Sequence, residues 1–135
     1  MLNRIANSFI SRLLRSPFHR LLSRRFMLIT VTGRKTGRKY TTPVNYVRRG
    51  DEVTVLSRKG RTWWLNLKGG GSVALHIGGE DLAGVGRVEE LAGADLAEAV
   101  QEFYEGIGRH ISLEKAAKRA QGRVVIRIKL GGGAS

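Results

Sequence analysis

A short loop rich in glycine and cationic residues has the composition of a chemical site. It reads, in order, Gly33, Arg34, Lys35, Thr36, Gly37, Arg38 and Lys39. The two glycines can take backbone angles that turn successive N–H groups into one anion-binding concavity. Arginine grips a phosphate with two parallel hydrogen bonds, and lysine adds a compact positive charge. The loop therefore predicts a site for an anionic group, although a solvated basic turn without a ligand has the same composition.

This loop matches neither of two common phosphate-binding motifs. A Walker loop has four residues between its glycines and then Lys followed by Ser or Thr. A dinucleotide fingerprint opens a helix, whereas residues 33–39 lie between two predicted strands. The mode of anion binding must come from this loop's own residues.

Two adjacent tryptophans, Trp63 and Trp64, lie on a short segment that ends in glycines at 69–71. Neighbouring side chains on so short an element point in different directions, so we expect only one to face the core. The other could lie against a flat aromatic ligand or cover a surface groove, and the Asn66 amide could bond a ring heteroatom. The basic turn at 57–60 offers a hydroxyl and N–H groups to the same ligand, but taken alone these residues are better explained as a plain turn.

Several classes of catalytic site have little support. The chain has no cysteine, which excludes disulfides, thiolate metal sites and a cysteine nucleophile. His19, His76 and His110 are far apart and lack metal-ligand spacing, so we expect no metal site. A domain without evident proton-transfer residues often takes its chemistry from a cofactor.

Positive charge is concentrated in the first half of the chain. The 24 Lys and Arg against 11 Asp and Glu give a net charge of +13, and residues 1–68 hold 16 of the bases but only two acids. Such asymmetry predicts an anionic partner: a polyanionic small molecule, lipid headgroups or nucleic acid. A module for single-stranded nucleic acid is the alternative, since Tyr40, Tyr46 and the tryptophans could stack on bases. No recognition motif appears, so we expect no nucleic-acid partner.

The elements that position these residues are mostly strands. Apolar or alternating runs bounded by glycine turns predict strands at 26–32, 40–49, 53–57, 72–77, 82–89 and 124–130. Pro43 indicates an edge strand or a bulge. Helical segments are expected at 61–68, at 95–104 after a capping box that begins with Asp95, and at 112–120. The order predicts a mainly β, α+β fold: a small antiparallel β-barrel of five or six strands with peripheral helices.

We expect the first 25 residues to form a separate amphipathic helical segment, followed by a barrel at 26–130 and a flexible tail at 131–135. Pro17 separates a helix at 3–15 from a shorter one. The apolar face of the first helix either covers the barrel or enters a membrane interface, where its basic residues suit anionic headgroups. Because no apolar run reaches membrane-spanning length and no secretory signal is evident, we expect a cytoplasmic protein. Peripheral contact of residues 1–25 with the inner face of the membrane stays open.

An ordered series of residues resembles the deazaflavin-dependent nitroreductase family, a branch of the split β-barrel flavin-like oxidoreductases. The series comprises residues 32–37, Thr42, Pro43, Val44, Tyr46, Gly50, Asp51, Ser57 and residues 64–68. It covers residues 26–90 well and the final strand loosely. The combination of the glycine-bracketed basic loop with a W-x-x-N-L stretch at this spacing is specific.

The resemblance implies a split β-barrel that binds 8-hydroxy-5-deazaflavin (coenzyme F-420), with FMN as the weaker alternative. Loop residues would hold the phosphate and polyglutamate tail: Arg34, Lys35, Thr36, Gly37 and Arg38. A second group would lie along the cofactor: Thr42, Pro43, Val44 and Tyr46. A third group would surround its ring: Ser57, Arg58, Trp63, Trp64 and Asn66.

The activity implied by the resemblance is hydride transfer from the reduced deazaflavin to a quinone-like or a nitro/enone-type acceptor. Nitro-reducing members carry a tyrosine-rich stretch before the last strand, whereas residues 105–121 contain no tyrosine here. Tyr104 and His110 are the candidate proton donors in its place. Barrels of this superfamily often pair, so a monomer and a homodimer both stay open.

Overall fold

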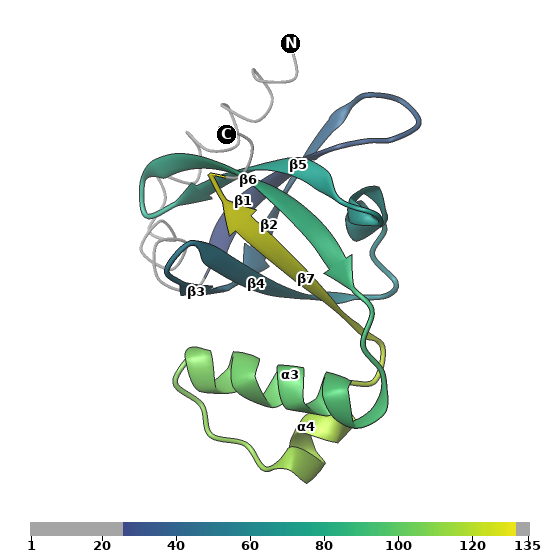
Figure 1. Cartoon of the computed structure of the whole chain (residues 1–135), viewed down its shortest axis with the longest axis vertical. Helices are drawn as coiled ribbons and strands as arrows, with labels where there is room; N and C mark the ends of the chain where they lie inside the picture. Colours follow the sequence, from purple (N-terminus) through teal and green to yellow (C-terminus); the bar gives the residue numbers. More distant parts are fainter. Residues whose placement is uncertain (1–25, 132–135) are drawn as a thin grey trace.

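The computed structural model describes residues 26–131, whose strands form one antiparallel sheet (Figure 1). The seven strands are β1 (Phe26–Thr32), β2 (Lys39–Asn45), β3 (Val47–Arg49), β4 (Glu52–Arg58), β5 (Gly71–Ile77), β6 (Glu80–Glu89) and β7 (Arg123–Leu130). Their order across the sheet is β2-β1-β5-β6-β7-β4-β3. The sequence-based expectation of a split antiparallel barrel is confirmed, with seven strands in place of five or six.

The additional strand arises at Tyr46. The single strand expected over 40–49 breaks there, because β2 pairs with β1 whereas β3 pairs with β4. Those two pairings lie at opposite ends of the strand order, so the chain passes from one end of the sheet to the other through this one residue. The sheet curls so that β2 approaches β4 without pairing with it, which leaves the barrel split between them. Pro43 lies on β2, the edge strand it was expected to mark.

The interior of the barrel is apolar and is filled by one face of each long strand. Its buried members are Met27, Ile29, Val31, Val53, Val55, Trp63, Trp64, Leu67, Val73, Leu75, Ile77, Val124, Ile126 and Ile128. These residues recur at every second position of a strand, except those of the short 3₁₀ helix η1 (Trp63–Leu67), which closes one end. The period-2 patterns read from the sequence therefore identified the core face.

Two helices cover part of the outer face of the sheet. Helices α3 (Gly93–Gly106) and α4 (Leu113–Arg119) lie below the sheet in Figure 1. They enclose a second small core of Val100, Ile111, Ala116 and Ala120, against which Leu56 of β4 packs. Strand β4 thus has Val53, Val55 and Ser57 toward the barrel and Leu56 toward the helices.

The helix starts differ in how well the sequence predicted them. Ser112 caps α4, because its Oγ accepts a hydrogen bond of 3.1 Å from the Lys115 N–H, as the expected helix at 112–120 requires. The capping box at Asp95 was wrong: α3 begins at Gly93, and its N-cap Ala92 has no side-chain bond. Asp95 lies instead inside the first turn, where a carboxylate suits the positive end of the helix dipole.

Within residues 26–131, no helix is long and apolar enough to span a bilayer. The amphipathic segment expected over residues 1–25 lies outside the described residues, as does most of the tail.

Candidate functional site

The basic loop joins β1 to β2 and projects from the sheet at the upper right of Figure 1. Its backbone is held internally: the Gly33 N–H donates to the Arg38 carbonyl at 2.6 Å, and the Gly37 N–H donates to the Gly33 carbonyl at 2.9 Å. Gly37 has a φ of 70°, and a Cβ on Gly33 would lie only 2.9 Å from Cε2 of Tyr40. The backbone angle at Gly37 therefore favours glycine there, and the Arg38 carbonyl oxygen, 3.2 Å from where a Cβ on Gly33 would lie, makes position 33 crowded.

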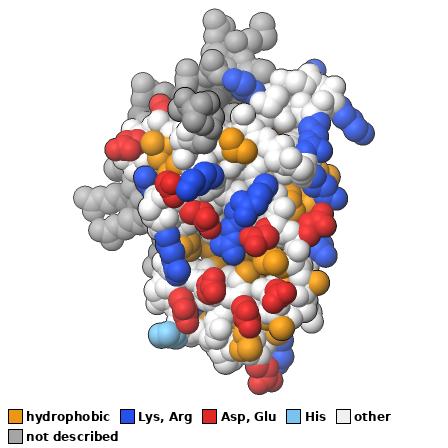
Figure 2. Space-filling view, in the orientation of Figure 1, with side chains coloured by type: hydrophobic (Ala, Val, Ile, Leu, Met, Phe, Trp, Pro, Cys, Tyr) orange, Lys and Arg blue, Asp and Glu red, His pale blue; other side chains and the backbone are white. Residues whose placement is uncertain are grey.

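Groups that can bind an anion remain open on this loop. The side chains of Arg34, Lys35 and Arg38 are exposed. Within residues 26–131, the backbone N–H groups of Lys35 and Thr36 have no hydrogen-bond acceptor. Figure 2 shows Lys and Arg side chains gathered at the upper right, whereas acidic side chains lie at the upper left, across the centre and over the helices. The loop is a cationic protrusion with free donors at its tip.

Asn66 connects this loop to η1. Its Oδ1 accepts a hydrogen bond of 3.1 Å from the Arg34 N–H, and its Nδ2 donates to the Trp63 carbonyl at 3.1 Å. The Arg34 guanidinium also passes over the glycine turn after η1, since a Cβ on Gly69 would lie 3.5 Å from Nη2 of Arg34. Asn66 thus acts as a link between loop and helix, and its contact with a ligand ring stays a prediction.

Both tryptophans are buried, so the expectation that only one would face the core was wrong. Trp63 and Trp64 are each 8% exposed and belong to the same core cluster. Helix η1 packs against β1, β5 and β6. Two neighbouring side chains on a 3₁₀ turn point about 120° apart, and with three strands around the helix both of them are buried. The Trp64 Nε1 is buried without a partner among the described residues, and the Lys68 Nζ lies 5.7 Å from the Trp64 ring centroid.

The split between β2 and β4 brings together four of the residues expected along the cofactor. Thr42 and Val44 share the barrel-facing side of β2, Tyr46 follows that strand, and Ser57 faces them from β4. Ser57 is only 5% exposed, and its Oγ donates to the Arg58 carbonyl at 3.3 Å. Pro43 points away and is exposed.

Polar groups at this split are neutral or cationic. Burial raises the pKa of the Tyr46 phenol, against a smaller opposing effect of the Arg48 guanidinium. The phenol therefore stays protonated at neutral pH. Arg61, which the sequence did not single out, donates from Nη2 to Oγ1 of Thr42 at 3.4 Å.

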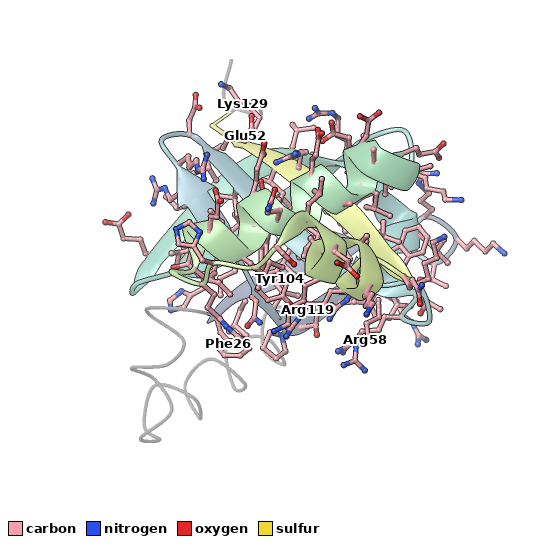
Figure 3. The ribbon with its side chains drawn as sticks, turned by 90° about the horizontal axis from the view of Figure 1, so that it is seen from below. Phe26, Glu52, Arg58, Tyr104, Arg119 and Lys129 are labelled. Atoms are coloured by element: carbon pink, nitrogen blue, oxygen red, sulfur yellow. The ribbon has the colours of Figure 1, made fainter. Side chains whose placement is uncertain are left out.

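The two candidate proton donors occupy different environments at the helical end of the molecule. Tyr104 on α3 lines a cavity of about 240 Å³, and its hydroxyl accepts a hydrogen bond of 3.2 Å from Nη1 of Arg119 (Figure 3). The His110 side chain is 94% exposed, with Nδ1 3.8 Å from a Glu105 carboxylate oxygen, and it does not line that cavity. The structure therefore gives Tyr104 an enclosed site and leaves His110 on the surface.

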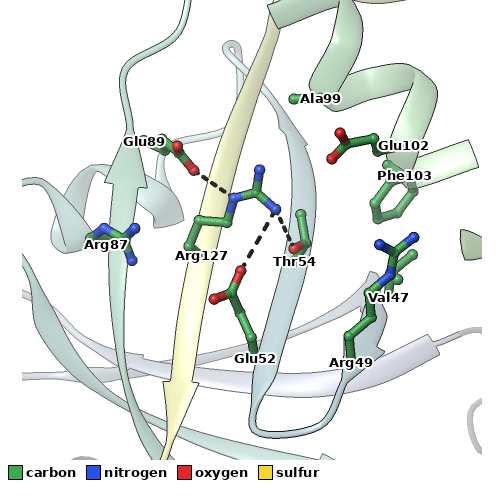
Figure 4. Close-up of a pocket in the computed structure, with 10 residues that line it drawn as sticks. All are labelled: Val47, Arg49, Glu52, Thr54, Arg87, Glu89, Ala99, Glu102, Phe103 and Arg127. Carbon is green, nitrogen blue, oxygen red and sulfur yellow. Dashed lines mark hydrogen bonds and ion pairs between the residues drawn. The ribbon is translucent and has the colours of Figure 1, made fainter. Parts of the chain in front are cut away.

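A second cavity, of about 300 Å³, lies between the sheet and α3 (Figure 4). At its centre Arg127 donates from Nε to Oε2 of Glu89 at 2.5 Å and from Nη1 to Oγ1 of Thr54 at 2.8 Å. The same Nη1 lies 3.9 Å from Oε1 of Glu52. Sequence reasoning missed this group, although an arginine in the middle of the otherwise apolar centre of the last strand is a usable signal. Because its charge is matched from β4 and β6, Arg127 ties three strands together and is not free to hold an anion.

Residues 4–127 match the family described as F420H2-dependent quinone reductase. The chain belongs to this family. Its cofactor is accordingly the deazaflavin F420, as the sequence resemblance implied, and the chain is an F420H2-dependent reductase.

Solved structures of similar fold agree with this family. A structure described as an F420-H2 dependent reductase superposes with a TM-score of 0.57 at 19% identity, covering 78% of this chain and 95% of that one. A structure described as an F420 reductase superposes with a TM-score of 0.53 at 13% identity, covering 87% of this chain and 95% of that one. A putative pyridoxamine 5'-phosphate oxidase from Listeria innocua gives 0.56 at 11% identity, with 94% of both chains covered. At these identities the likeness shows the fold alone.

The residues present at this end of the barrel fit such a cofactor. A phosphate with a polyglutamate tail needs several cations and free N–H donors, and the β1–β2 loop presents both. The side chains of β2 and β4 that face the barrel at the split are neutral polar or apolar, which suits contact with a flat ring.

Proposed function

We propose that this chain transfers a hydride from the reduced deazaflavin to a quinone-like small molecule, with nitro and enone compounds as weaker acceptors. The observation that carries the proposal is the basic loop held by Asn66 beside the split in the barrel. The family supports a quinone as the acceptor class. The missing tyrosine-rich stretch before the last strand weighs against nitro compounds.

Each group of residues has a part in this proposal. The anionic tail is neutralised by Arg34, Lys35 and Arg38, with hydrogen bonds from Thr36, Gly37 and the free N–H groups of the loop. The long axis of the cofactor follows Thr42, Pro43, Val44 and Tyr46. The ring is bordered by Ser57 and Arg58, while Trp63, Trp64 and Asn66 support it from the core side.

When bound, the reduced deazaflavin supplies a hydride from its C5 carbon. The chain contributes placement of the two reactants, exclusion of water and stabilisation of negative charge on the acceptor. A neutral Tyr46 phenol at the split avoids repulsion with an anionic ligand. A similar structure is described as a domain-swapped dimer, and light scattering on this chain would show whether it too forms a homodimer.

A fluorescence titration tests the cofactor site. Because both tryptophans lie at this end of the barrel, coenzyme F-420 should quench their emission saturably. The double variant Arg34→Ala/Lys35→Ala should weaken the affinity about 100-fold, as expected for two lost charge-assisted hydrogen bonds. Lys115→Ala/Lys118→Ala removes the same charge from exposed positions on α4 and should leave the affinity unchanged.

A parallel titration with a single-stranded oligonucleotide addresses the competing interpretation. If the oligonucleotide binds, with an affinity that falls steeply in salt, while the cofactor does not, the reductase proposal fails. Equal affinity of both double variants for the cofactor would reject the loop as its tail-binding site.

A further inference from the structure

The cavity beside Tyr104 has the shape and chemistry of an acceptor site. It encloses about 240 Å³. We propose that this Tyr104 cavity binds a planar quinone and that Arg119 positions the Tyr104 hydroxyl toward it. The inference rests on the proposed function and assigns the place where the acceptor lies.

The lining of the cavity matches a flat ring that carries carbonyl oxygens. Phe26, Leu56, Phe103 and Ile107 supply apolar walls. Two guanidinium groups, of Arg109 and Arg123, and the Tyr104 hydroxyl supply donors, and none of the described residues that line the cavity is acidic. A fused aromatic ring gains from the apolar walls, while its carbonyl oxygens need the donors.

The cavity adjoins the residues that border the cofactor ring in the proposed function. Its Asn45 directly precedes Tyr46, and its Leu56 directly precedes Ser57. Arg123 is the partner of Arg58 in the β4–β7 ladder. Because Asn45 belongs to β2 and Leu56 to β4, the cavity lies across the split between these strands, on the side of the helices. A ring held in the split would thus border the cavity on its helix side, and we expect the acceptor to approach the ring from there.

The charges of the cavity suit the reaction. Hydride addition to a quinone breaks the C–H bond of the donor with its electron pair, so the cofactor is oxidised by two electrons. The quinone becomes a hydroquinone anion, and one proton completes the hydroquinone. Guanidinium groups of Arg109 and Arg123 face the space where this negative charge develops, and cations already in place stabilise it without reorganisation.

Arg119 controls which way the Tyr104 hydroxyl can donate. Its Nη1 donates to the phenol oxygen at 3.2 Å, and its guanidinium carbon lies 5.0 Å from the ring centroid. The Arg109 guanidinium carbon lies 5.8 Å from the same centroid. Since the phenol oxygen already accepts from Arg119, its own hydrogen is available to the cavity. Tyr104 is therefore the hydrogen-bond and proton donor, and Arg119 is a positioning residue.

Binding can be measured without the cofactor. Because the chain has no cysteine, menadione can be added without forming a thiol adduct. The chain has only three tyrosines, so NMR of protein labelled at the tyrosine ring carbons can follow each of them during the titration. The Tyr104 signal, assigned with Tyr104→Phe, should shift saturably, whereas the signal of Tyr40 should not. Absence of a saturable shift at Tyr104 would overturn the proposal.

Turnover with menadione separates a positioning role from a structural one. Arg119→Met should lower kcat about tenfold, leave the dissociation constant of the cofactor unchanged and move the Tyr104 signal. Arg119→Lys should restore part of kcat, and Lys118→Met, at the exposed neighbouring position, should resemble the parent protein. Combining Arg119→Met with Tyr104→Phe should add little to either loss, because the two groups act as a unit.

The outcomes distinguish this inference from the proposed function. If the cofactor binds and menadione is reduced, but the Arg119 and Tyr104 variants keep the parent kcat, the cavity is rejected and the function stands. If the cofactor fails to quench the tryptophans, the function is rejected, while a saturable Tyr104 shift still supports the cavity as a quinone site.

Discussion

Asn66 illustrates how the internal hydrogen bonds of one side chain can shape a binding site. Both ends of its amide are used within the protein, toward Arg34 and toward the Trp63 carbonyl. These bonds fix the base of the basic loop relative to a buried helix. The site therefore has a preorganised loop, which lowers the cost of ordering it on binding.

Replacement of Asn66 by alanine should lower both stability and cofactor affinity. The loss of two internal hydrogen bonds is expected to cost roughly 1–3 kcal/mol in the free energy of unfolding, measured by urea titration. Leu65→Ala, at the 41% exposed neighbouring position on η1, is the control and should change both quantities little. Lower affinity at unchanged stability would favour a direct contact between Asn66 and the cofactor ring.

Tyr46 should make the protein sensitive to alkali. Burial raises its pKa above the ordinary 10.0, so the fold favours the protonated phenol. This contribution to stability is complete below pH about 10 and is lost as pH rises through the folded-state pKa. Tyr46→Phe should reduce that loss in unfolding curves taken between pH about 9 and 11, whereas Tyr40→Phe, at a 45% exposed position, should not. Identical curves for Tyr46→Phe and the parent would contradict this assignment.

At the scale of elements, the end of α3 lies unusually close to β3. A Cβ on Gly106 would lie 2.5 Å and 2.9 Å from the two methyl carbons of Val47. Gly106 thus lets the helix approach the strand that follows the crossing at Tyr46. The same helix end carries Tyr104, so this contact also places one wall of the Tyr104 cavity.

Gly106→Ala should therefore destabilise the protein, in contrast to the usual effect of alanine in a helix. Helix propensity alone would favour alanine by about 1 kcal/mol, but the clash with Val47 is expected to cost roughly 1–3 kcal/mol more than that gain. Urea unfolding measures the difference, and Val47→Ala in the same chain should restore much of it. Gly60→Ala, where a Cβ would meet nothing within 4 Å, is the control. A stabilised Gly106→Ala protein would show that the helix can move away at no cost.

At the scale of the whole molecule, charge is divided between two ends. The basic loop lies at one end and the helices, with their acidic side chains, at the other (Figure 2). The exposed cations of the basic loop therefore create a field that attracts an anionic cofactor. A neutral quinone is not subject to this attraction.

Salt should accordingly affect the two ligands differently. Raising the ionic strength from about 0.05 to 0.5 M should weaken cofactor binding about tenfold and leave menadione binding nearly unchanged, because screening acts on charged pairs. The tryptophan fluorescence titration measures cofactor binding, and the tyrosine NMR titration measures menadione binding. The Arg34→Ala/Lys35→Ala variant should show a smaller salt dependence for the cofactor. Equal salt dependence for this variant and the parent would place the tail elsewhere.

The sequence by itself determined those features that depend on local pattern. The bounds of β1 at Phe26–Thr32, the short helix around Trp63 and the helix expected over 112–120 all follow from sequence patterns within a few residues. The cofactor class also followed from the sequence, through its resemblance to a family. That resemblance depends on the basic loop and the W-x-x-N-L stretch and on the spacing between them.

Only the tertiary structure decided how distant segments meet. It placed β7 between β6 and β4, broke the expected strand at Tyr46, buried both tryptophans and brought Arg119 to the Tyr104 hydroxyl. Each of these features depends on which other element packs against a residue. In each case that element lies far away in the chain. A periodic pattern reports which face of an element is apolar, but it holds no information on the partner that buries this face.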